Sequence, residues 1–172
     1  AYHHPSQVLP IDPERYDMVV LGQEVMAPYA QADAKGRARF SLPGSMARPL
    51  PYLGYAPGAF LGGVTDWILK QAGTPVHLER VYETDMAEGL KVMALEGLGI
   101  AFLPRSAVKK DVHAGALVEL GLPDGSSLNL SMEVRAYREK PGNRQVPKRS
   151  AADLWSYLVN KTQMETEARP LS

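Results

Sequence analysis

The chain has 172 residues, of which 45% are apolar and 22% are charged, and its 19 basic side chains balance 19 acidic ones. This composition is typical of a folded globular protein, and a neutral chain has no overall field to hold a polyanion, so we expect no DNA binding by this piece alone. The absence of cysteine excludes disulfides, thiolate metal ligands and cysteine nucleophiles.

The first part of the chain is predicted to be extended. Prolines 5, 10 and 13 favour an irregular entry over residues 2–15. The apolar runs 18–21 and 25–30 indicate two strands separated at Gly22, the second interrupted by Pro28 or placed at a sheet edge. The polar residues 31–39 then predict a loop.

The middle of the chain alternates between strands and helices. An extended apolar segment at 49–53 leads into a turn at 54–58. Apolar residues at helical spacing predict a helix over 59–72, ended by a left-handed Gly73 and by Pro75. Residues 76–82 follow as a strand.

A second helix is predicted to begin at Asp85. Asp85 and Glu88 are spaced like a capping box, in which each carboxylate accepts a backbone N–H at the helix start. The inner face of this helix is apolar and consists of Leu90, Met93 and Ala94. Gly97 ends the helix, and residues 99–104 (GIAFLP) predict a buried strand, so the order of elements is that of an α/β fold.

The last part of the chain returns to a strand and a helix. A short helix at 106–113, ending at Gly115, and a brief strand at 117–120 come first. Apolar and polar residues alternate over 128–136, which predicts a half-buried strand, and the basic segment 138–149 predicts a solvated loop. A final helix from about Ser150 has one apolar face, made of Leu154, Trp155, Leu158 and Val159.

Residues 83–121, ETDMAEGLKVMALEGLGIAFLPRSAVKKDVHAGALVELG, resemble the signature region of LysR-type effector domains. The shared pattern is a capped helix ending in a glycine pair, a "GxGIAxLP" strand, a short helix and "GxLVxL". The resemblance extends over the chain from about residue 19 onward. It implies an α/β fold of two lobes like a periplasmic binding protein, with an effector in the cleft and no catalytic activity.

The resemblance also implies a domain organisation. Residues 1–44 would be part of the first lobe with the first crossover strand, 45–126 a complete second α/β lobe, and 127–172 the return crossover strand and C-terminal helix. The first lobe would lack its N-terminal part. Such regulators form homo-oligomers, dimers or tetramers, and contact promoter DNA through an N-terminal winged helix-turn-helix, which we do not find in this sequence.

The resemblance and the physics of helix starts both place an effector at two turns, 55–58 and 84–86. Free N–H groups at helix starts lie at the ends of strands, where α/β sheets bind polar ligands. Thr84 could donate a hydroxyl, whereas the carboxylate of Asp85 would repel an anion. The candidate effector-binding residues are Pro28, Tyr29, Tyr55, Ala56, Pro57, Gly58, Thr84, Asp85, Met86 and Phe102. The alternative is that these are ordinary caps and turns.

Met86 is also a candidate redox sensor. Within the family, the sequence is similar to the hypochlorite-responsive, methionine-oxidation-sensing branch, in which a methionine lies at the start of this same helix. The alternative is a packing methionine, because methionine commonly fills irregular gaps in protein interiors.

Metal binding and catalysis have no support in the sequence. His3 and His4 are adjacent without a third ligand, which favours an exposed tail, and no G-x-S-x-G or phosphate-binding glycine pattern occurs at the required place. We expect no cofactor. No apolar run could cross a bilayer and the first ten residues lack an export signal, so a cytoplasmic protein is predicted. Two other functions stay open, a solute-binding protein of related fold and a small α/β enzyme.

Overall fold

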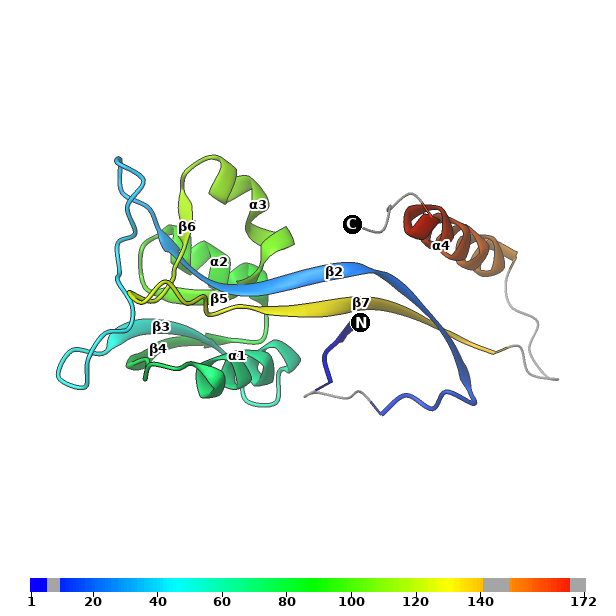
Figure 1. Ribbon diagram of the computed structural model, residues 1–172, viewed down its shortest axis with the longest axis horizontal. Helices are drawn as coiled ribbons and strands as arrows, with labels where there is room; N and C mark the ends of the chain where they lie inside the picture. The colour runs from blue at the N-terminus through cyan, green and yellow to red at the C-terminus, as the bar shows by residue number, and fades with distance from the viewer. Residues whose placement is uncertain (6–9, 141–148, 168–172) are drawn as a thin grey trace. The chain divides into compact units, whose positions relative to one another are not determined.

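The computed structural model describes residues 1–5, 10–140 and 149–167, and the side chains of the last helix as far as residue 162. The chain forms two compact units. Unit 1 consists of Ala1–Gln23 and Met132–Ser172, and unit 2 of Glu24–Ser131. Two long strands, β2 (Tyr16–Gln31) and β7 (Leu130–Glu139), each contribute to both units (Figure 1).

Unit 2 is built on a mixed sheet. Strands β5 (Ile100–Pro104), β3 (Leu50–Tyr55) and β4 (Leu78–Thr84) are parallel neighbours in this order. The C-terminal half of β2 pairs antiparallel with β5 and also with the short strand β6 (Leu117–Glu119). The expected α/β architecture of this part of the chain is therefore confirmed.

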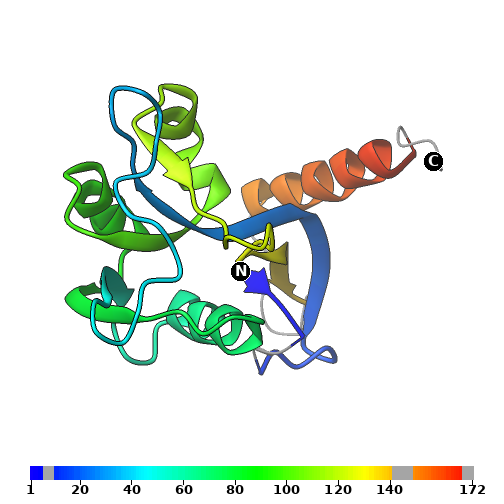
Figure 2. The same cartoon turned by 60° about the vertical axis from the view of Figure 1, so that its left-hand side comes forward.

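Three helices cover this sheet. From β3 the chain passes through α1 (Phe60–Gln71) to β4 on one side, and then back through α2 (Ala87–Leu95) to β5 on the other side. Because such crossovers are right-handed, the reversal of direction puts α1 and α2 on opposite faces, as Figures 1 and 2 show. Lys91 of α2 donates to the carbonyl of Ala107, at 3.2 Å, so α3 (Arg105–His113) packs beside α2.

The core of unit 2 lies around β5. Ile100, Ala101, Phe102 and Leu103 are all fully buried, which confirms the predicted buried strand. A parallel strand with a helix layer on each face has no solvent-facing side, so its sequence is apolar without alternation. The inner face of α2 is anchored by Leu90 and Ala94, both also fully buried.

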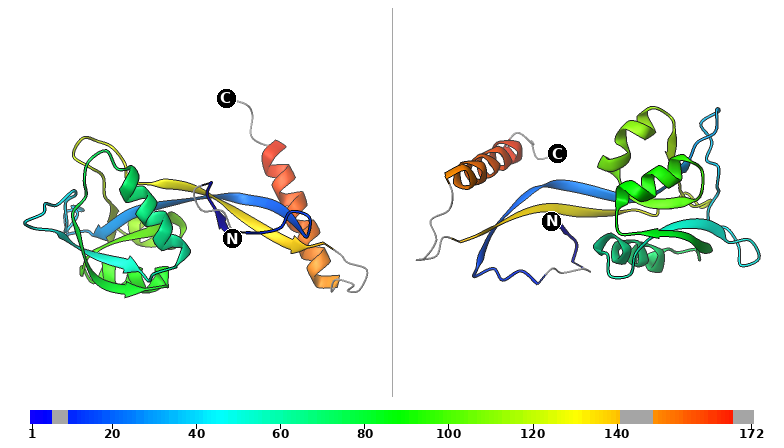
Figure 3. Two further views of the ribbon diagram at one scale, coloured as in Figure 1. Left: turned by 90° about the horizontal axis from the view of Figure 1, so that it is seen from below. Right: turned by 180° about the vertical axis from the view of Figure 1, so that it is seen from behind.

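Unit 1 consists of a small sheet and a long helix. The short strand β1 (Tyr2–His3) pairs antiparallel with β7, and β7 lies next to the N-terminal half of β2. Arg138 on β7 donates to the carboxylate of Asp17 on β2 at 2.7 Å. The helix α4 (Arg149–Glu167) is a single continuous helix (Figure 3).

The prediction of two separate strands near the start was wrong. β2 runs unbroken from Tyr16 to Gln31, through both Gly22 and Pro28. The carbonyl of Pro28 accepts a hydrogen bond from the N–H of Leu120, so the nitrogen of Pro28 faces the same side of β2. Because β6 has already ended at Glu119 on that side, the N–H that proline lacks is not needed for strand pairing.

The predicted capping box at Asp85 was also wrong. The N-cap of α2 is Met86, with no side-chain bond to the helix, and the helix starts at Ala87. Glu88 instead pairs with Lys91 at 2.6 Å, and the hydroxyl of Thr84 accepts the N–H of Met86 at 3.3 Å. The threonine therefore takes the local turn-forming role that the sequence had suggested for Asp85.

Three further details differ from expectation. Gly73 has no positive φ, and α1 ends instead at Ala72 in an extended conformation, with φ −59° and ψ 128°. The entry segment includes β1, and His3 lies 4.0 Å from the carboxylate of Glu133 instead of in an exposed tail. The predicted basic loop at 138–149 begins inside β7, and its residues 141–148 lie outside the described part of the chain.

Candidate functional site

The ends of β3 and β4 lie side by side and carry most of the predicted effector residues. Tyr55 is paired with Thr84 in the parallel register, and the N–H of Ala56 donates to the carbonyl of Thr84 at 2.9 Å. The two turns that follow, 56–58 and 85–86, therefore leave the sheet together. They do so because parallel neighbouring strands end at the same edge of a sheet.

Each of these turns leads into a helix whose N-cap makes no side-chain bond. The caps are Ala59 for α1 and Met86 for α2. The first N–H groups of a helix have no partner within the helix, and they carry the positive end of its dipole. The edge formed by β3 and β4 thus presents two helix starts that can donate hydrogen bonds to a polar ligand.

The predicted residues divide into a buried group and an exposed group. Tyr55 and Phe102 are buried, and the hydroxyl of Tyr55 donates to the carbonyl of Phe102 at 3.1 Å. Pro28 lies opposite Phe102 in the antiparallel pairing of β2 with β5. Pro57, Gly58, Asp85 and Met86 are exposed, while Ala56 and Thr84 are half-buried. Direct contact with a ligand is therefore open mainly to the two turns.

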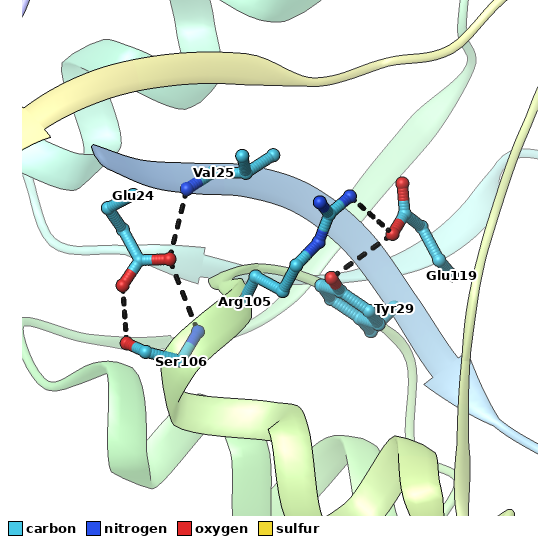
Figure 4. Close-up of polar contacts among 6 residues, drawn as sticks. All are labelled: Glu24, Val25, Tyr29, Arg105, Ser106 and Glu119. Carbon is cyan, nitrogen blue, oxygen red and sulfur yellow. Dashed lines mark hydrogen bonds and ion pairs between the residues drawn. The ribbon is translucent and has the colours of Figure 1, made fainter. Parts of the chain in front are cut away.

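Tyr29 lies in a separate polar cluster. Its ring is 1% exposed, and its hydroxyl donates to Glu119 at 3.3 Å. Arg105 pairs with the same carboxylate at 3.2 Å (Figure 4). Burial raises the pKa of Tyr29, with a further contribution from the charge of Glu119, and the hydrogen bond with Tyr29 is the main cause of a raised pKa at Arg105.

Glu24 is a buried carboxylate that the sequence analysis did not single out. It is 7% exposed, and one of its oxygens accepts the N–H of Val25 at 3.0 Å and that of Ser106 at 3.2 Å. Its second oxygen accepts a short hydrogen bond from the hydroxyl of Ser106 (Figure 4). Glu24 therefore caps the start of α3 from a strand that is distant in the sequence.

A signal for this cap was present in the sequence. The N-cap of α3 is Pro104, which has neither a hydroxyl nor a carboxylate. The first N–H groups of a helix have no partner within the helix, and a lone acidic residue next to an apolar strand is a candidate to accept hydrogen bonds from them. The start of α3 is thus capped by the carboxylate of Glu24, whereas the N-caps of α1 and α2 make no side-chain hydrogen bond.

The described residues contain no group of three or more His, Asp or Glu side chains that could hold a metal ion. Nor does any helix within the described ranges have both the length and the apolar character needed to cross a membrane.

Comparison with known proteins identifies the family. The model of the LysR substrate binding domain matches residues 7–153, which is most of the chain. The chain belongs to the LysR substrate-binding domain family. This domain is the effector-binding part of LysR-type transcriptional regulators and is not an enzyme. Membership of the family therefore excludes the alternative that the chain is a small α/β enzyme.

Two curated relatives from Escherichia coli are regulators. The HTH-type transcriptional regulator YjiE of strain K12 is 28% identical over 133 residues, covering 77% of this chain and 41% of YjiE. The HTH domain-truncated transcriptional regulator QseD of O157:H7 is 26% identical over 132 residues, covering 77% of this chain and 51% of QseD. The chain thus spans about half the length of these relatives or less.

Solved structures of HypT from Salmonella typhimurium share the fold. The apo regulatory domain has a TM-score of 0.73 at 23% identity, over 92% of this chain and 69% of that one. Full-length HypT, described as a hypochlorite-specific LysR-type transcriptional regulator, has a TM-score of 0.70 at 24% identity, over 91% of this chain and 48% of that one. This likeness supports the periplasmic-binding-protein-like α/β fold expected from the sequence.

Proposed function

We propose that the chain senses a small polar effector or an oxidant at the two turns 55–58 and 84–86. The signal passes to transcription through rearrangement of lobes and subunits in a cytoplasmic homo-oligomer, whose promoter contacts come from a winged helix-turn-helix. The observation that carries this proposal is the hydrogen bond from Ala56 to Thr84, at 2.9 Å, which holds two uncapped helix starts together.

The chemistry of the site suits a ligand with a polar or partly negative group. Two helix starts supply N–H donors and positive dipole ends, and the hydroxyl of Thr84 can donate while it accepts the N–H of Met86. The exposed carboxylate of Asp85 beside these donors selects against a highly charged anion and in favour of a ligand that also carries a donor, such as an amino or hydroxy acid.

Effector binding can be tested by NMR titration of the labelled chain with acetate, glycine and lactate as probes. We expect the amide signals of residues 58–62 and 86–89 to shift, and Thr84→Val to weaken binding about tenfold by removing one hydrogen bond. Thr74→Val, in the loop after α1, is the matched control and should bind like the wild type. Shifts confined to other residues would contradict the proposed site.

Oxidant sensing is proposed for Met86. Its side chain is 63% exposed at the N-cap of α2, and the full-length HypT structure is described as hypochlorite-specific. Oxidation turns an apolar thioether into a sulfoxide, a strong acceptor that could bond the free N–H groups of the α2 start. A bias of about 1.4 kcal/mol would move a two-state equilibrium tenfold.

Mass spectrometry after graded hypochlorite treatment of the full-length regulator tests this proposal. We expect early modification of Met86, and Met86→Gln, a polar mimic, should alter transcription without oxidant. Met46, which is 86% exposed, serves as the reference for oxidation by exposure alone. If Met86→Ile responds normally to hypochlorite, Met86 is a surface methionine without a sensing role.

A further inference from the structure

Three helices begin at one edge of the unit 2 sheet. Because β5, β3 and β4 are parallel neighbours, their C-terminal ends lie together, and they lead into α3, α1 and α2 respectively. Each helix start offers N–H donors without a partner in the helix and the positive end of the helix dipole. The structure treats these three starts differently.

The start of α3 already holds a carboxylate. Glu24 accepts three hydrogen bonds, from the N–H of Val25 and from the N–H and the hydroxyl of Ser106. Figure 4 shows its carboxylate directed at Ser106 on the first turn of α3. Glu24 is only 7% exposed, so its hydration has been replaced by these bonds, and bonds to an ionised acceptor are about twice as strong as neutral ones.

The strand register places Glu24 at this position. In the antiparallel pairing of β2 with β5, Met26 lies opposite Pro104, so continuation of the pairing by two residues brings Glu24 opposite Ser106. Ser106 is the second residue of α3, and Pro104 is its N-cap and has no polar side chain. The carboxylate at this helix start is therefore supplied by the sheet, from a residue that is 82 positions away in the sequence.

The starts of α1 and α2 are built without such an anion. The cap of α1 is Ala59, and the first turn of this helix contains no acidic residue. The acidic residue in the first turn of α2, Glu88, is paired with Lys91 at 2.6 Å. The edge of the sheet therefore combines two helix starts without a side-chain cap and one start that an internal carboxylate fills.

We propose that Glu24 is a specificity residue, whose carboxylate occupies the start of α3 as a built-in anion and so confines an acidic effector to the starts of α1 and α2. The inference rests on the proposed function for the two open starts and adds the reason why the third is closed. It follows that removal of the Glu24 side chain creates a new site for an external carboxylate at the start of α3.

Acetate is the matched probe for this new site. Glu24→Ala removes a CH2–COO⁻ group, which has nearly the size and the charge of acetate. In an NMR titration of the full chain at constant ionic strength, acetate should shift the amide signals of residues 105–107 of this variant. The shifts should saturate with a dissociation constant on the order of 10 mM. In the wild type the same signals should not move, even at ~100 mM acetate, about ten times that constant.

Variants and a neutral ligand separate a filled site from a general effect of acetate. Glu24→Gln keeps the volume of the side chain and an acceptor oxygen, so the signals of residues 105–107 should not respond to acetate. Acetamide has the shape of acetate without its charge and should bind Glu24→Ala at least about tenfold more weakly. Ser106→Ala, added to Glu24→Ala, should weaken acetate binding about tenfold, because the hydroxyl donor is lost.

Urea unfolding gives a second readout of the same site. The unfolding midpoint of Glu24→Ala should lie below that of the wild type, and ~100 mM acetate, about ten times the expected dissociation constant, should restore about half of the loss or more. The same acetate should raise the midpoints of the wild type and of Glu24→Gln by less, because neither has the new site.

Three results would overturn the proposal. Saturable acetate shifts at residues 105–107 of the wild type would show that the start of α3 is open despite Glu24. The same shifts in Glu24→Gln would show that an occupying side chain does not close it. Their absence in Glu24→Ala would show that the start of α3 holds no external carboxylate. Failure of the proposed function is distinguishable, because it concerns the signals of residues 58–62 and 86–89 in the wild type.

Discussion

At the scale of single residues, Glu24 is the most consequential side chain that lies outside the two effector turns. Its buried carboxylate bonds the N–H and the hydroxyl of Ser106 at the start of α3. A buried charge is tolerated when hydrogen bonds replace its hydration, and here a helix dipole adds a favourable field. Glu24 thereby fastens the beginning of the unit 2 half of β2 to α3.

We predict that Glu24→Ala destabilises unit 2 by about 1–3 kcal/mol, because the N–H and the hydroxyl of Ser106 both lose a charged acceptor. Urea unfolding measures this change. Glu79→Ala, at an exposed position on β4, is the control and should change stability by less than about 0.5 kcal/mol. A double-mutant cycle with Ser106→Ala should show coupling of about 1 kcal/mol. Additive effects would show that the pair does not interact in solution.

Tyr29 is expected to make the free energy of unfolding decrease at alkaline pH. Because burial raises the pKa of Tyr29 above its ordinary value near 10, the neutral phenol is favoured in the folded state. The corresponding stability is fully present below pH ~10 and is lost as the pH rises through the folded pKa. Burial raises the pKa of Tyr52 in the same direction.

We therefore predict that urea stability of the wild type falls above pH ~10 more steeply than that of Tyr29→Phe, with a difference of up to about 1.4 kcal/mol per pH unit. Unfolding midpoints between pH 8 and 11.5 (a span placed around the ordinary tyrosine pKa of about 10) measure it. Tyr52→Phe should remove a second part of the slope. Equal slopes for the wild type and Tyr29→Phe would mean that the phenol of Tyr29 does not stay neutral.

At the scale of elements, the end of α2 is fixed by a glycine and a glutamine. Gly97 has φ +72°, and its N–H and that of Leu98 close the helix on the carbonyls of Ala94 and Met93. Gln31, from the end of β2, donates to the carbonyl of Leu95 at 2.7 Å. A Cβ on Gly97 would collide with the side chain of Gln31.

Gly97→Ala is predicted to cost about 1 kcal/mol more stability than Gly115→Ala. Both glycines end helices in the left-handed region, with φ +72° and +71°, but a Cβ on Gly115 would meet nothing within 4 Å. Gly115→Ala thus reports backbone strain alone, about 1–2 kcal/mol, while Gly97→Ala also displaces Gln31. Chemical unfolding of the two variants gives the comparison. In a Gln31→Ala background the difference should vanish.

The elements that the sequence predicted well are those whose signals are local. The helices 59–72 and 106–113 and the strand 99–104 were found within one or two residues, because apolar spacing and terminal glycines act within a few residues. Long-range partners were missed. The continuity of β2 through Pro28 depends on where β6 ends, the cap of α3 comes from Glu24, and β1 exists only because β7 accepts it.

The candidate site shows the same division. The sequence analysis placed an effector at the turns 55–58 and 84–86, and the parallel register of Tyr55 with Thr84 brings the two turns to one edge of the sheet. Side-chain roles within the turns were less predictable, because Thr84 and Asp85 can each accept a backbone N–H locally. In the structure Thr84 is the acceptor, for the N–H of Met86. The choice between Thr84 and Asp85 depends on the direction of the chain as it leaves β4, which is set by the sheet and not by these local residues.

At the scale of the whole molecule, the distribution of charge matters more than its sum. The chain is formally neutral, and several arginines already have carboxylate partners, such as Arg138 with Asp17 and Arg15 with Glu139. Ion pairs of this kind leave little positive potential to attract a polyanion. Unit 2, which contains the effector turns, likewise pairs Arg105 with Glu119 and Lys91 with Glu88.

We predict that this chain alone does not bind promoter DNA specifically. A neutral, ion-paired surface can form few phosphate contacts, and each contact contributes about −0.9 to the slope of log K against log salt for duplex DNA. Fluorescence anisotropy with a labelled promoter should therefore show weak binding at low salt that disappears near 150 mM, a salt level of physiological order where the Debye length is about 8 Å. A scrambled duplex of equal length should bind equally. Retention of the promoter over the scrambled duplex at physiological salt would contradict this and would locate a base-reading surface within the 172 residues.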